Sequence, residues 1–364
     1  MGERLNKLIS AAAAAWAGVA CQSGDAIGAT TSSAPATSLP MSQPASAPGG
    51  YVAGESIRVG AGMSKSIAAG DGLLLTAGDG GLAILNRGGA AQAVSVAVSC
   101  VAISRGEIFA GVGSSVQVFD KQGRLIRQWS VRDAAVLTSI AADERNVYVA
   151  DAANRVVWRF DRLGSPLGCI GKAAVSRVAD VSSARAEGVS PSQIQEALSA
   201  GGRDVRAARG QDARDAESVG FVVPSPYFDV IVSPDGLLRV ANPGMHRIEA
   251  RTADGQLEFH WGVAGTGEQA FPGCCNPAQI AILPDGRLVT SDKGAIRRIR
   301  IWKSDGPNAG TAGQLDVTVA GPTDLGPGPG PLDLVVGADG TIYALDSAAG
   351  IVRVYKPVLR EGRP

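Results

Sequence analysis

The sequence predicts an all-β fold in which six repeated sheets are arranged as a β-propeller. The chain of 364 residues contains 48 Gly and 20 Pro, and its apolar residues fall in short alternating runs rather than in long helical periods. One pattern recurs six times, and its copies begin near Ser66, Cys100, Ser139, Asp229, Gln279 and Asp333. Repeats of about 35 to 55 residues, each with about four short strands, are typical of propellers, because no single sheet can bury both of its faces.

Residues 1–21 predict a secretory signal that is not part of the fold. Arg4 and Lys7 precede an apolar stretch from Leu8 to Ala20, which is too short to span a bilayer as a helix. Gly18-Val-Ala20 has the small-x-small spacing that a signal peptidase needs, and Cys21 follows directly. This arrangement resembles the bacterial lipoprotein signal, in which that cysteine is lipidated. Ordinary cleavage to a soluble exported product, or a segment of neither kind, are the alternatives.

Residues 22–50 predict a flexible tether between the signal and the folded part. The segment is rich in Ser, Thr, Ala, Pro and Gly, so it cannot bury enough apolar area to offset the entropy of ordering it. The propeller is expected over residues 51–357, with a tail at 358–364. The expected location is the cell envelope or periplasm of the exporting cell, with membrane contact only through the lipid anchor.

Tight turns and matching strand ends define the ring. The turns between the first two strands of five repeats are expected to use positive φ angles. They are Asp71-Gly72, Arg105-Gly106, Asp235-Gly236, Asp285-Gly286 and Asp339-Gly340. Outer strands end in Cys169-Ile-Gly171 and His260-Trp-Gly262, and Ile57-Arg-Val-Gly60 ends in the same way although it precedes the first blade. Because blade 6 shows only three strands, residues 55–60 are expected to supply its fourth and so remove the free edges.

The third repeat carries a resemblance to a known family. It reads Val147-Tyr-Val-Ala-Asp-Ala-Ala-Asn-Arg-Val-Val-Trp-Arg-Phe-Asp-Arg-Leu-Gly164, which resembles the NHL-repeat family of six-bladed β-propellers. Pro224-Ser-Pro-Tyr-Phe-Asp229 and Gly273-Cys-Cys-Asn-Pro277 are similar to segments of a bacterial exported subset of that family without an assigned activity. The resemblance therefore implies a fold far more than a function.

The positions of long insertions predict which rim of the propeller carries its function. They lie at residues 173–220, 263–277 and 307–331, each between the outer strand of one blade and the inner strand of the next. Function is expected on this inserted rim, although insertions also accumulate wherever loops tolerate them. In the first insertion, Ser190-Pro-Ser-Gln193 predicts the start of a helix through a capping box. That insertion would be a lid, a docking arm or a solvated loop.

Polar residues begin the six inner strands and are expected to ring the mouth of the central channel. They are Ser66, Cys100, Ser139, Asp229, Gln279 and Asp333. Asp229 and Asp333, together with hydroxyl and amide oxygens, would suit a hard cation such as Ca²⁺ on the axis. In the other interpretation these side chains solvate the channel and bond backbone groups. His246 is a further candidate at the mouth, as a general base or as a residue that hydrogen-bonds within its loop.

The adjacent pair Cys274-Cys275 is the most unusual local feature. An exported protein matures where free thiols are disfavoured, and Cys100, Cys169, Cys274 and Cys275 allow three pairings. Adjacent cysteines bond only as a strained vicinal ring, and a link from Cys100 to either requires the loop to cross the channel mouth. The pair is interpreted as a redox-active disulfide, a soft-metal thiolate site or a structural clasp.

Composition narrows the classes of function. With 34 basic and 34 acidic residues the chain lacks the basic surplus that nucleic-acid binding needs, and two His exclude a three-His metal site. The sequence contains no Gly-rich loop that joins a strand to a helix, as phosphate binding requires, and no Gly-x-Ser-x-Gly nucleophile elbow before a helix. The leading prediction is a scaffold that binds a protein or a small-molecule ligand in the cell envelope. The alternatives are a lactonase-like, metal-dependent hydrolase with a cation on the axis, and a redox partner that uses Cys274-Cys275.

Overall fold

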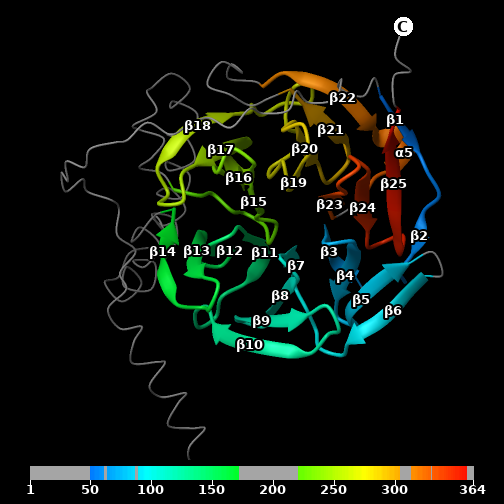
Figure 1. The fold of residues 1–364 in the computed structure, drawn as a ribbon. Coiled ribbons are helices and arrows are strands. Elements are labelled where there is room, and N and C mark those ends of the chain that lie inside the picture. The colour runs from blue at the N-terminus through cyan, green and yellow to red at the C-terminus, as the bar shows by residue number, and fades with distance from the viewer. Residues whose placement is uncertain are drawn as a thin grey trace, which may run out of the picture.

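The computed structural model describes residues 50–60, 64–86, 89–171, 220–303, 313–328 and 330–358. In these residues six sheets radiate around one axis, as the blades of a β-propeller (Figure 1). The predicted six-bladed fold is confirmed. The predicted signal with Cys21, the tether up to residue 49, most of the first insertion with its helix at Ser190, and the tail from residue 359 lie outside the described residues.

Each blade is an antiparallel meander that runs outward from the axis. Blade 1 contains β3 (Ser64–Gly70), β4 (Leu73–Gly78), β5 (Gly81–Asn86) and β6 (Gly89–Val94). Blade 2 contains β7 (Val101–Ser104), β8 (Glu107–Val112), β9 (Ser115–Asp120) and β10 (Leu125–Ser130). Blade 3 contains β11 (Leu137–Ala142), β12 (Asn146–Asp151), β13 (Val156–Asp161) and β14 (Pro166–Ile170).

The second half of the ring repeats this order. Blade 4 contains β15 (Val230–Val232), β16 (Leu238–Asn242), β17 (Arg247–Arg251) and β18 (Leu257–Trp261). Blade 5 contains β19 (Gln279–Ile282), β20 (Leu288–Ser291), β21 (Ile299–Trp302) and β22 (Leu315–Ala320). Blade 6 contains β23 (Asp333–Val336), β24 (Ile342–Asp346) and β25 (Ile351–Pro357). Two short helices lie in loops of one rim, η2 (Pro243–Met245) and α5 (Pro322–Leu325).

The chain ends close the ring. β1 (Tyr51–Ala53) and β2 (Ile57–Arg58) both pair antiparallel with β25, so the N-terminal segment supplies the outer strand of blade 6. Tyr51 lies opposite Pro357, and its hydroxyl donates to the carbonyl of Gly340 at 3.2 Å. The predicted closure is confirmed, and the paired segment begins four residues earlier than the sequence indicated, at residue 51 rather than 55. Pairing head to tail gives blade 6 the outer strand that each of the other blades draws from its own segment of the chain.

Aromatic and aliphatic side chains fill the spaces between blades. Between blades 4 and 5, Trp261, Phe271 and Trp302 pack with ring centroids 4.9 to 5.9 Å apart, and all three are buried. Phe109 and Trp158 belong to the corresponding cluster between blades 2 and 3. Full burial of one such ring contributes about 1.5 to 3 kcal/mol. Successive side chains of a strand point to opposite faces of its blade. The apolar side chains on these faces pack against the neighbouring blades and hold them together.

The tight turns fall into two groups that differ in backbone conformation. Asp71 and Arg105 have positive φ angles of 52° and 55°, and the glycines that follow them are also positive, as predicted. In the last three blades only the glycine is positive, so the expectation was wrong for their aspartates. Asp235, for example, accepts the backbone N–H of Leu237 at 3.0 Å, and it stabilises the turn through its side chain.

The helices in the described ranges include none that is both long enough and apolar enough to cross a membrane.

Candidate functional site

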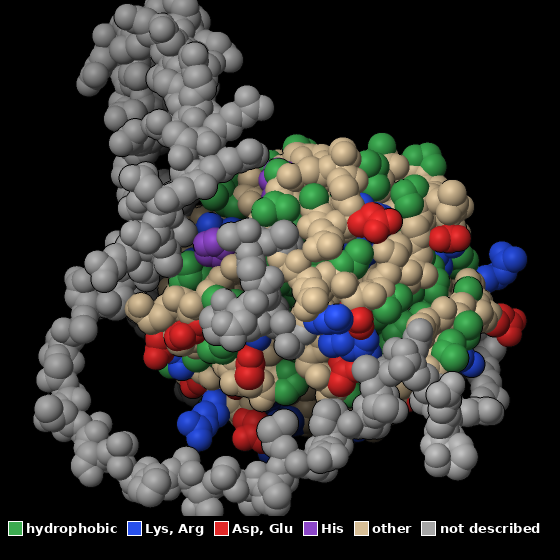
Figure 2. Space-filling view, turned by 90° about the horizontal axis from the view of Figure 1, so that it is seen from above, with side chains coloured by type: hydrophobic (Ala, Val, Ile, Leu, Met, Phe, Trp, Pro, Cys, Tyr) green, Lys and Arg blue, Asp and Glu red, His purple; other side chains and the backbone are tan. Residues whose placement is uncertain are grey.

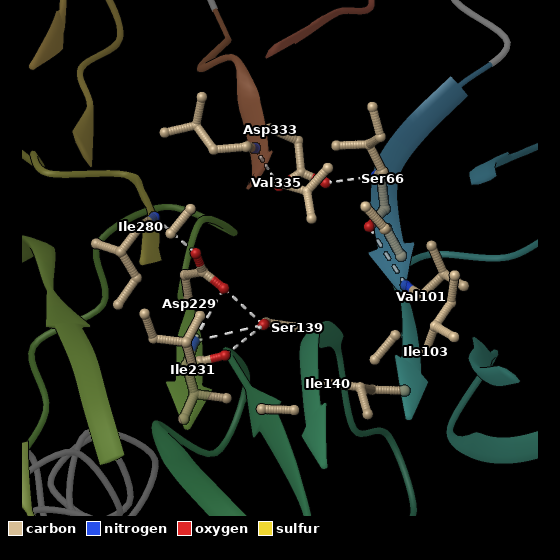
Figure 3. Close-up of a pocket in the computed structure, with 18 of the residues that line it drawn as sticks. Ser66, Val101, Ile103, Ser139, Ile140, Asp229, Ile231, Ile280, Asp333 and Val335 are labelled. Carbon is tan, nitrogen blue, oxygen red and sulfur yellow. Dashed lines mark hydrogen bonds between the residues drawn. The ribbon is translucent and has the colours of Figure 1, made fainter. Parts of the chain in front are cut away.

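A cavity of about 260 Å³ lies on the axis, lined by the six inner strands (Figure 3). Four of the six predicted mouth residues line it: Ser66, Ser139, Asp229 and Asp333. Most of the remaining lining is Ala, Val, Ile and Leu, among them Ile103 and Val335. The axial cavity is thus polar at the start of the inner strands and apolar along their length.

Asp229 joins three blades through one carboxylate. Its Oδ1 accepts the hydroxyl of Ser139 in blade 3 at 2.6 Å and the N–H of Val230 in its own blade at 2.9 Å. Its Oδ2 accepts the N–H of Ile280 in blade 5 at 2.8 Å. These contacts satisfy buried donors of three blades and so hold neighbouring inner strands in register.

The same contact recurs at other blade junctions. Asp333 accepts the N–H of Ile67 at 2.7 Å, and Ser66 accepts the N–H of Val101 at 3.3 Å. The Ser139 hydroxyl accepts the N–H of Val230 at 3.4 Å. In each case the side chain that begins one inner strand caps the backbone of the next blade. These bonds support the interpretation that the polar strand starts bond backbone groups.

Cys100 and Gln279 occupy the same register but do not line the cavity. Cys100 is 1% exposed and packs in the cluster between blades 2 and 3, where the Ser99 hydroxyl donates to its sulfur at 3.7 Å. Burial raises the pKa of the Cys100 thiol to about 12, so it stays protonated. A thiol is a weak hydrogen-bond acceptor. Cys100 is therefore a poor substitute for the side-chain oxygens that accept a backbone N–H of another blade at Ser66, Asp229 and Asp333.

Burial makes both channel aspartates weak acids. It raises the pKa of Asp229 to about 7, assisted by the charge of Asp333, and raises the pKa of Asp333 to about 6. Within the described ranges no group of three or more His, Cys, Asp or Glu is arranged to hold a metal ion. The carboxylate oxygens proposed as ligands accept N–H and O–H bonds, and the Ca²⁺ site at Asp229 and Asp333 stays a prediction.

Loops on the inserted rim form a connected surface over blades 4, 5 and 6. We call it the rim layer and define it by residues 243–246, 262–278, 292–298 and 321–328. Gly294 and Gly328 exchange backbone hydrogen bonds, at 3.1 and 3.5 Å, which ties blade 5 to the connection that leads into blade 6. Arg297 donates to the carbonyl of Leu325 at 3.3 Å in the same region. The loop 292–298 therefore touches the neighbouring connections on its blade 6 side.

Buried guanidinium groups support the rim layer from below. Asp292 is fully buried and accepts Arg300 at 2.7 Å and Arg298 at 3.2 Å. The two arginines also donate to backbone carbonyls of the connection between blades 4 and 5, including that of Ala270 at 2.8 and 3.0 Å. Removing one member of such a buried group leaves an unpaired charge, which costs about 3 to 5 kcal/mol. The connection at 263–271 is therefore fixed to blade 5.

The segment 273–277, which we call the dithiol loop, is clamped on both sides. His246 Nε2 lies 2.8 Å from the carbonyl oxygen of Gly273. Asn276 is 1% exposed; its amide donates to the carbonyls of Pro272 and Lys293, at 2.6 and 3.1 Å, and its oxygen accepts the N–H of Lys293 at 2.9 Å. His246 thus belongs to the rim layer and does not line the axial cavity, where it was expected.

The structure separates Cys100 from the pair Cys274-Cys275. Cys274 and Cys275 have their sulfurs 2.7 Å apart, and both are free, as is Cys100. Cys100 sits in the core between blades 2 and 3, so the structure does not bring it to the dithiol loop. Cys169 lies in β14 and packs against that same core. The disulfide between Cys100 and the pair therefore finds no support.

Two further polar residues lie outside the site. Asp151 accepts the N–H groups of Ala153 and Asn154 at 3.1 and 3.2 Å and the indole N–H of Trp158 at 3.0 Å, so it stabilises the turn and strand of its repeat. His260 lies on the outer strand β18 of blade 4, as the sequence predicted. Burial lowers its pKa.

Sequence reasoning did not identify three groups around the dithiol loop. Asn276 fixes its conformation, and Lys293 and Tyr227 form a cation–π contact beside it, with the ammonium 5.5 Å from the ring centroid. From the motif Gly-Cys-Cys-Asn-Pro, roles were predicted only for the two cysteines. The only signal for Asn276 was its place directly before a proline.

Charge on the visible surface is mixed. Figure 2 shows acidic and basic side chains interspersed on the side of the molecule that it presents. Among the described residues in this view, side chains of one sign do not gather into an extended patch.

Comparison with known proteins supports the fold alone. No protein-family model matches the chain, and no curated protein does so either. A structural genomics protein of unknown function from Bacteroides thetaiotaomicron matches with a TM-score of 0.52 and 14% identity, over 83% of this chain and 72% of that one. The WD40 β-propeller domain of Doa1 has a TM-score of 0.47 and 13% identity, over 82% and 80% of the two chains. A streptogramin B lyase structure has a TM-score of 0.45 and 11% identity, over 84% and 98%.

Proposed function

We propose that this chain is an exported propeller of the NHL-repeat type that binds a protein or ligand of the cell envelope through its rim layer. The observation that carries the proposal is the connectivity of that layer. The loop of blade 5 is bonded to the connection into blade 6 at Gly294 and Gly328, and the arginines that pair with Asp292 bond the carbonyl of Ala270 in the connection from blade 4. A surface held in this way loses little conformational freedom when a partner binds, so more of the contact energy appears as affinity.

Binding accounts for the axial residues better than catalysis does. In the described part of the chain, the carboxylates at the channel mouth accept hydrogen bonds that connect blades, as Asp229 does with Ser139 and Ile280. A hydrolase with a metal on the axis would need those oxygens as ligands. The hydrolase alternative therefore has less support than a scaffold, and elemental analysis of the purified protein tests it directly.

The test of binding compares substitutions on the two rims. Gln269 and Thr266 are exposed in the connection between blades 4 and 5, whereas Gln122 and Gln256 are exposed in turns of the opposite rim. We expect Gln269→Arg with Thr266→Arg to reduce recovery of cross-linked partners from the cell envelope by about tenfold, since a misplaced charge at an interface costs more than 1 kcal/mol.

Gln122→Arg with Gln256→Arg is the matched control, because it adds the same charge on the same fold. The control should recover partners as the unaltered chain does, and all variants should share its melting curve. Equal partner recovery by the two double variants would refute binding at the rim layer.

A further inference from the structure

The two sulfurs of the dithiol loop differ sharply in access. Cys274 is exposed, whereas Cys275 is 2% exposed and sits beneath it with the sulfurs 2.7 Å apart. An external molecule can therefore reach the Cys274 sulfur directly but meets Cys275 only through Cys274. The clamps at Gly273 and Asn276, on either side of the pair, hold this arrangement.

Donors collect around the buried sulfur. Lys293 is fixed by two backbone bonds to Asn276, one residue beyond Cys275. The Ser225 Oγ atom is buried and forms no hydrogen bond of normal geometry within the described residues, yet it lies near enough to influence the thiol. Burial raises the pKa of Cys275, but the neighbouring Cys274, Lys293 and Ser225 side chains outweigh burial, so the net pKa is lowered. Cys274 has a raised pKa, because it donates its proton toward Cys275.

We infer that Cys274 and Cys275 form a thiol–disulfide exchange pair, in which Cys274 attacks an exposed disulfide and Cys275 resolves the mixed disulfide. The geometry assigns the roles, because only the first sulfur is accessible and only the second is surrounded by donors. Cys100 offers the contrast within the same chain, as a buried thiol in an apolar cluster whose pKa is raised by that burial. The inference does not depend on the proposed binding function.

The exchange balances in two steps. Cys274 passes its proton to the Cys275 thiolate and attacks one sulfur of a disulfide R–S–S–R′, which forms a Cys274–S–S–R bond and releases R′–S⁻. Cys275 then loses that proton and attacks the Cys274 sulfur, which forms the vicinal disulfide and releases R–S⁻. Two electrons pass from the pair to the external disulfide, and the single proton of the thiol–thiolate pair ends on one of the two released thiolates. Lys293 stabilises the Cys275 thiolate before each attack.

The test uses the full chain, reduced and freed of reductant, with the aromatic disulfide dithiobis(nitrobenzoate) as the probe. We expect release of two thionitrobenzoate groups from the pair, the second at a rate that does not depend on probe concentration. Mass mapping of an acid digest should then show the 274–275 peptide lighter by two hydrogens. Release of the second group at a rate proportional to probe, with two separate adducts, would overturn the inference.

Three variants separate the roles. Cys275→Ser should stop at one adduct on Cys274, and Cys274→Ser should react at least about tenfold more slowly, since its remaining thiol is buried. Lys293→Met keeps the length of the stem and removes the charge, so the pH profile of the second step should move upward by about one unit, a tenfold loss of thiolate near neutral pH.

Cys100→Ser is the matched control, and it should leave both phases unchanged. Melting curves establish that each variant is folded. A Cys274→Ser chain that reacts as fast as the unaltered one would assign the attack to another sulfur, and an unmoved pH profile in Lys293→Met would remove the lysine from the mechanism. A failure here leaves partner recovery by the rim variants unaffected, so the two proposals fail separately.

Discussion

At the scale of single residues, the channel aspartates serve two purposes that conflict. Asp229 must accept hydrogen bonds from Ser139 and Ile280 to join its neighbours, which favours the ionised carboxylate. It also lies in a buried site opposite Asp333, which disfavours the charge, and the second effect raises its pKa to about 7. The protein therefore gives up stability near neutral pH to keep an acceptor at this position.

This conflict predicts a pH dependence of stability with a definite sign. An unfolded aspartate titrates near the ordinary value of 3.8, while Asp229 in the native state titrates near 7. The native state binds the proton more tightly, so the stability that Asp229 contributes is fully present below the unfolded pKa and is lost as the pH rises through 7. We expect the free energy of unfolding to fall between about pH 4 and pH 7 and to level off above that range, with a slope from this residue of at most about 1.4 kcal/mol per pH unit.

Urea denaturation at a series of pH values measures that slope. Asp229→Asn removes the titrating group, so its slope should be shallower whatever its absolute stability. Asp133→Asn is the control, because Asp133 is exposed in a loop, and it should keep the slope of the unaltered chain. The same slope in all three proteins would show that Asp229 does not titrate in this range.

At the scale of elements, two short strands decide whether the ring is closed. β1 and β2 are bonded to β25 at both of its ends, and Tyr51 and Ile57 pack against neighbouring apolar clusters. Without them β25 would present an unpaired edge, and those clusters would face water. The N-terminal segment is therefore a structural part of the last blade.

A pair of truncated chains tests this role. A chain that starts at residue 61 should melt roughly 10 °C below one that starts at residue 50. Such a shift corresponds to a loss of about 3 to 5 kcal/mol, since each kcal/mol shifts the melting temperature by about 2 to 4 °C in domains of about 150 to 250 residues. Differential scanning calorimetry of both chains is the measurement. Coincident melting curves would contradict closure by the N-terminal strands.

The sequence predicted elements better than contacts. The six-fold repeat, the ends of the outer strands and the closing segment near Ile57 follow from local patterns, which depend on neighbours along the chain. The bond from Ile280 to Asp229 joins residues 51 positions apart, so no local pattern announces it. Cys100 was expected at the channel because it shares the register of Asp229. The register was right, but a thiol suits the apolar cluster between blades better than the polar mouth.

The sequence predicted the location of the rim layer but not the contacts that hold it together. The lengths of the insertions indicated the rim, whereas the arginines that fix it alternate in Arg298-Ile-Arg300 as an ordinary exposed strand edge would. Their burial follows from Asp292 and from the carbonyl of Ala270, which lie in other segments of the chain. Buried ion pairs of this kind depend on tertiary packing, and one sequence alone does not reveal them.

At the scale of the whole molecule, the N-terminal signal predicts attachment to a membrane through Cys21. If the cysteine is lipidated, Cys21→Ser should move the protein from the membrane pellet to the soluble envelope fraction, because the lipid supplies the apolar surface that holds it there. Immunoblots of fractionated cells measure the distribution. The propeller itself should fold equally well in both forms. An unchanged distribution would favour ordinary cleavage or another mode of retention.

The pairing of Tyr51 with Pro357 also determines on which side of the propeller a lipid-anchored N-terminal segment would join it. Tyr51 reaches Gly340, which belongs to a short turn on the side opposite the dithiol loop, and Gly50 accepts the N–H of Val358 there. The first and last described residues, Gly50 and Val358, thus lie on the underside of the disc. A lipid-held molecule would be suspended by that underside, with the loops of blades 4 to 6 turned outward toward whatever passes through the surrounding space.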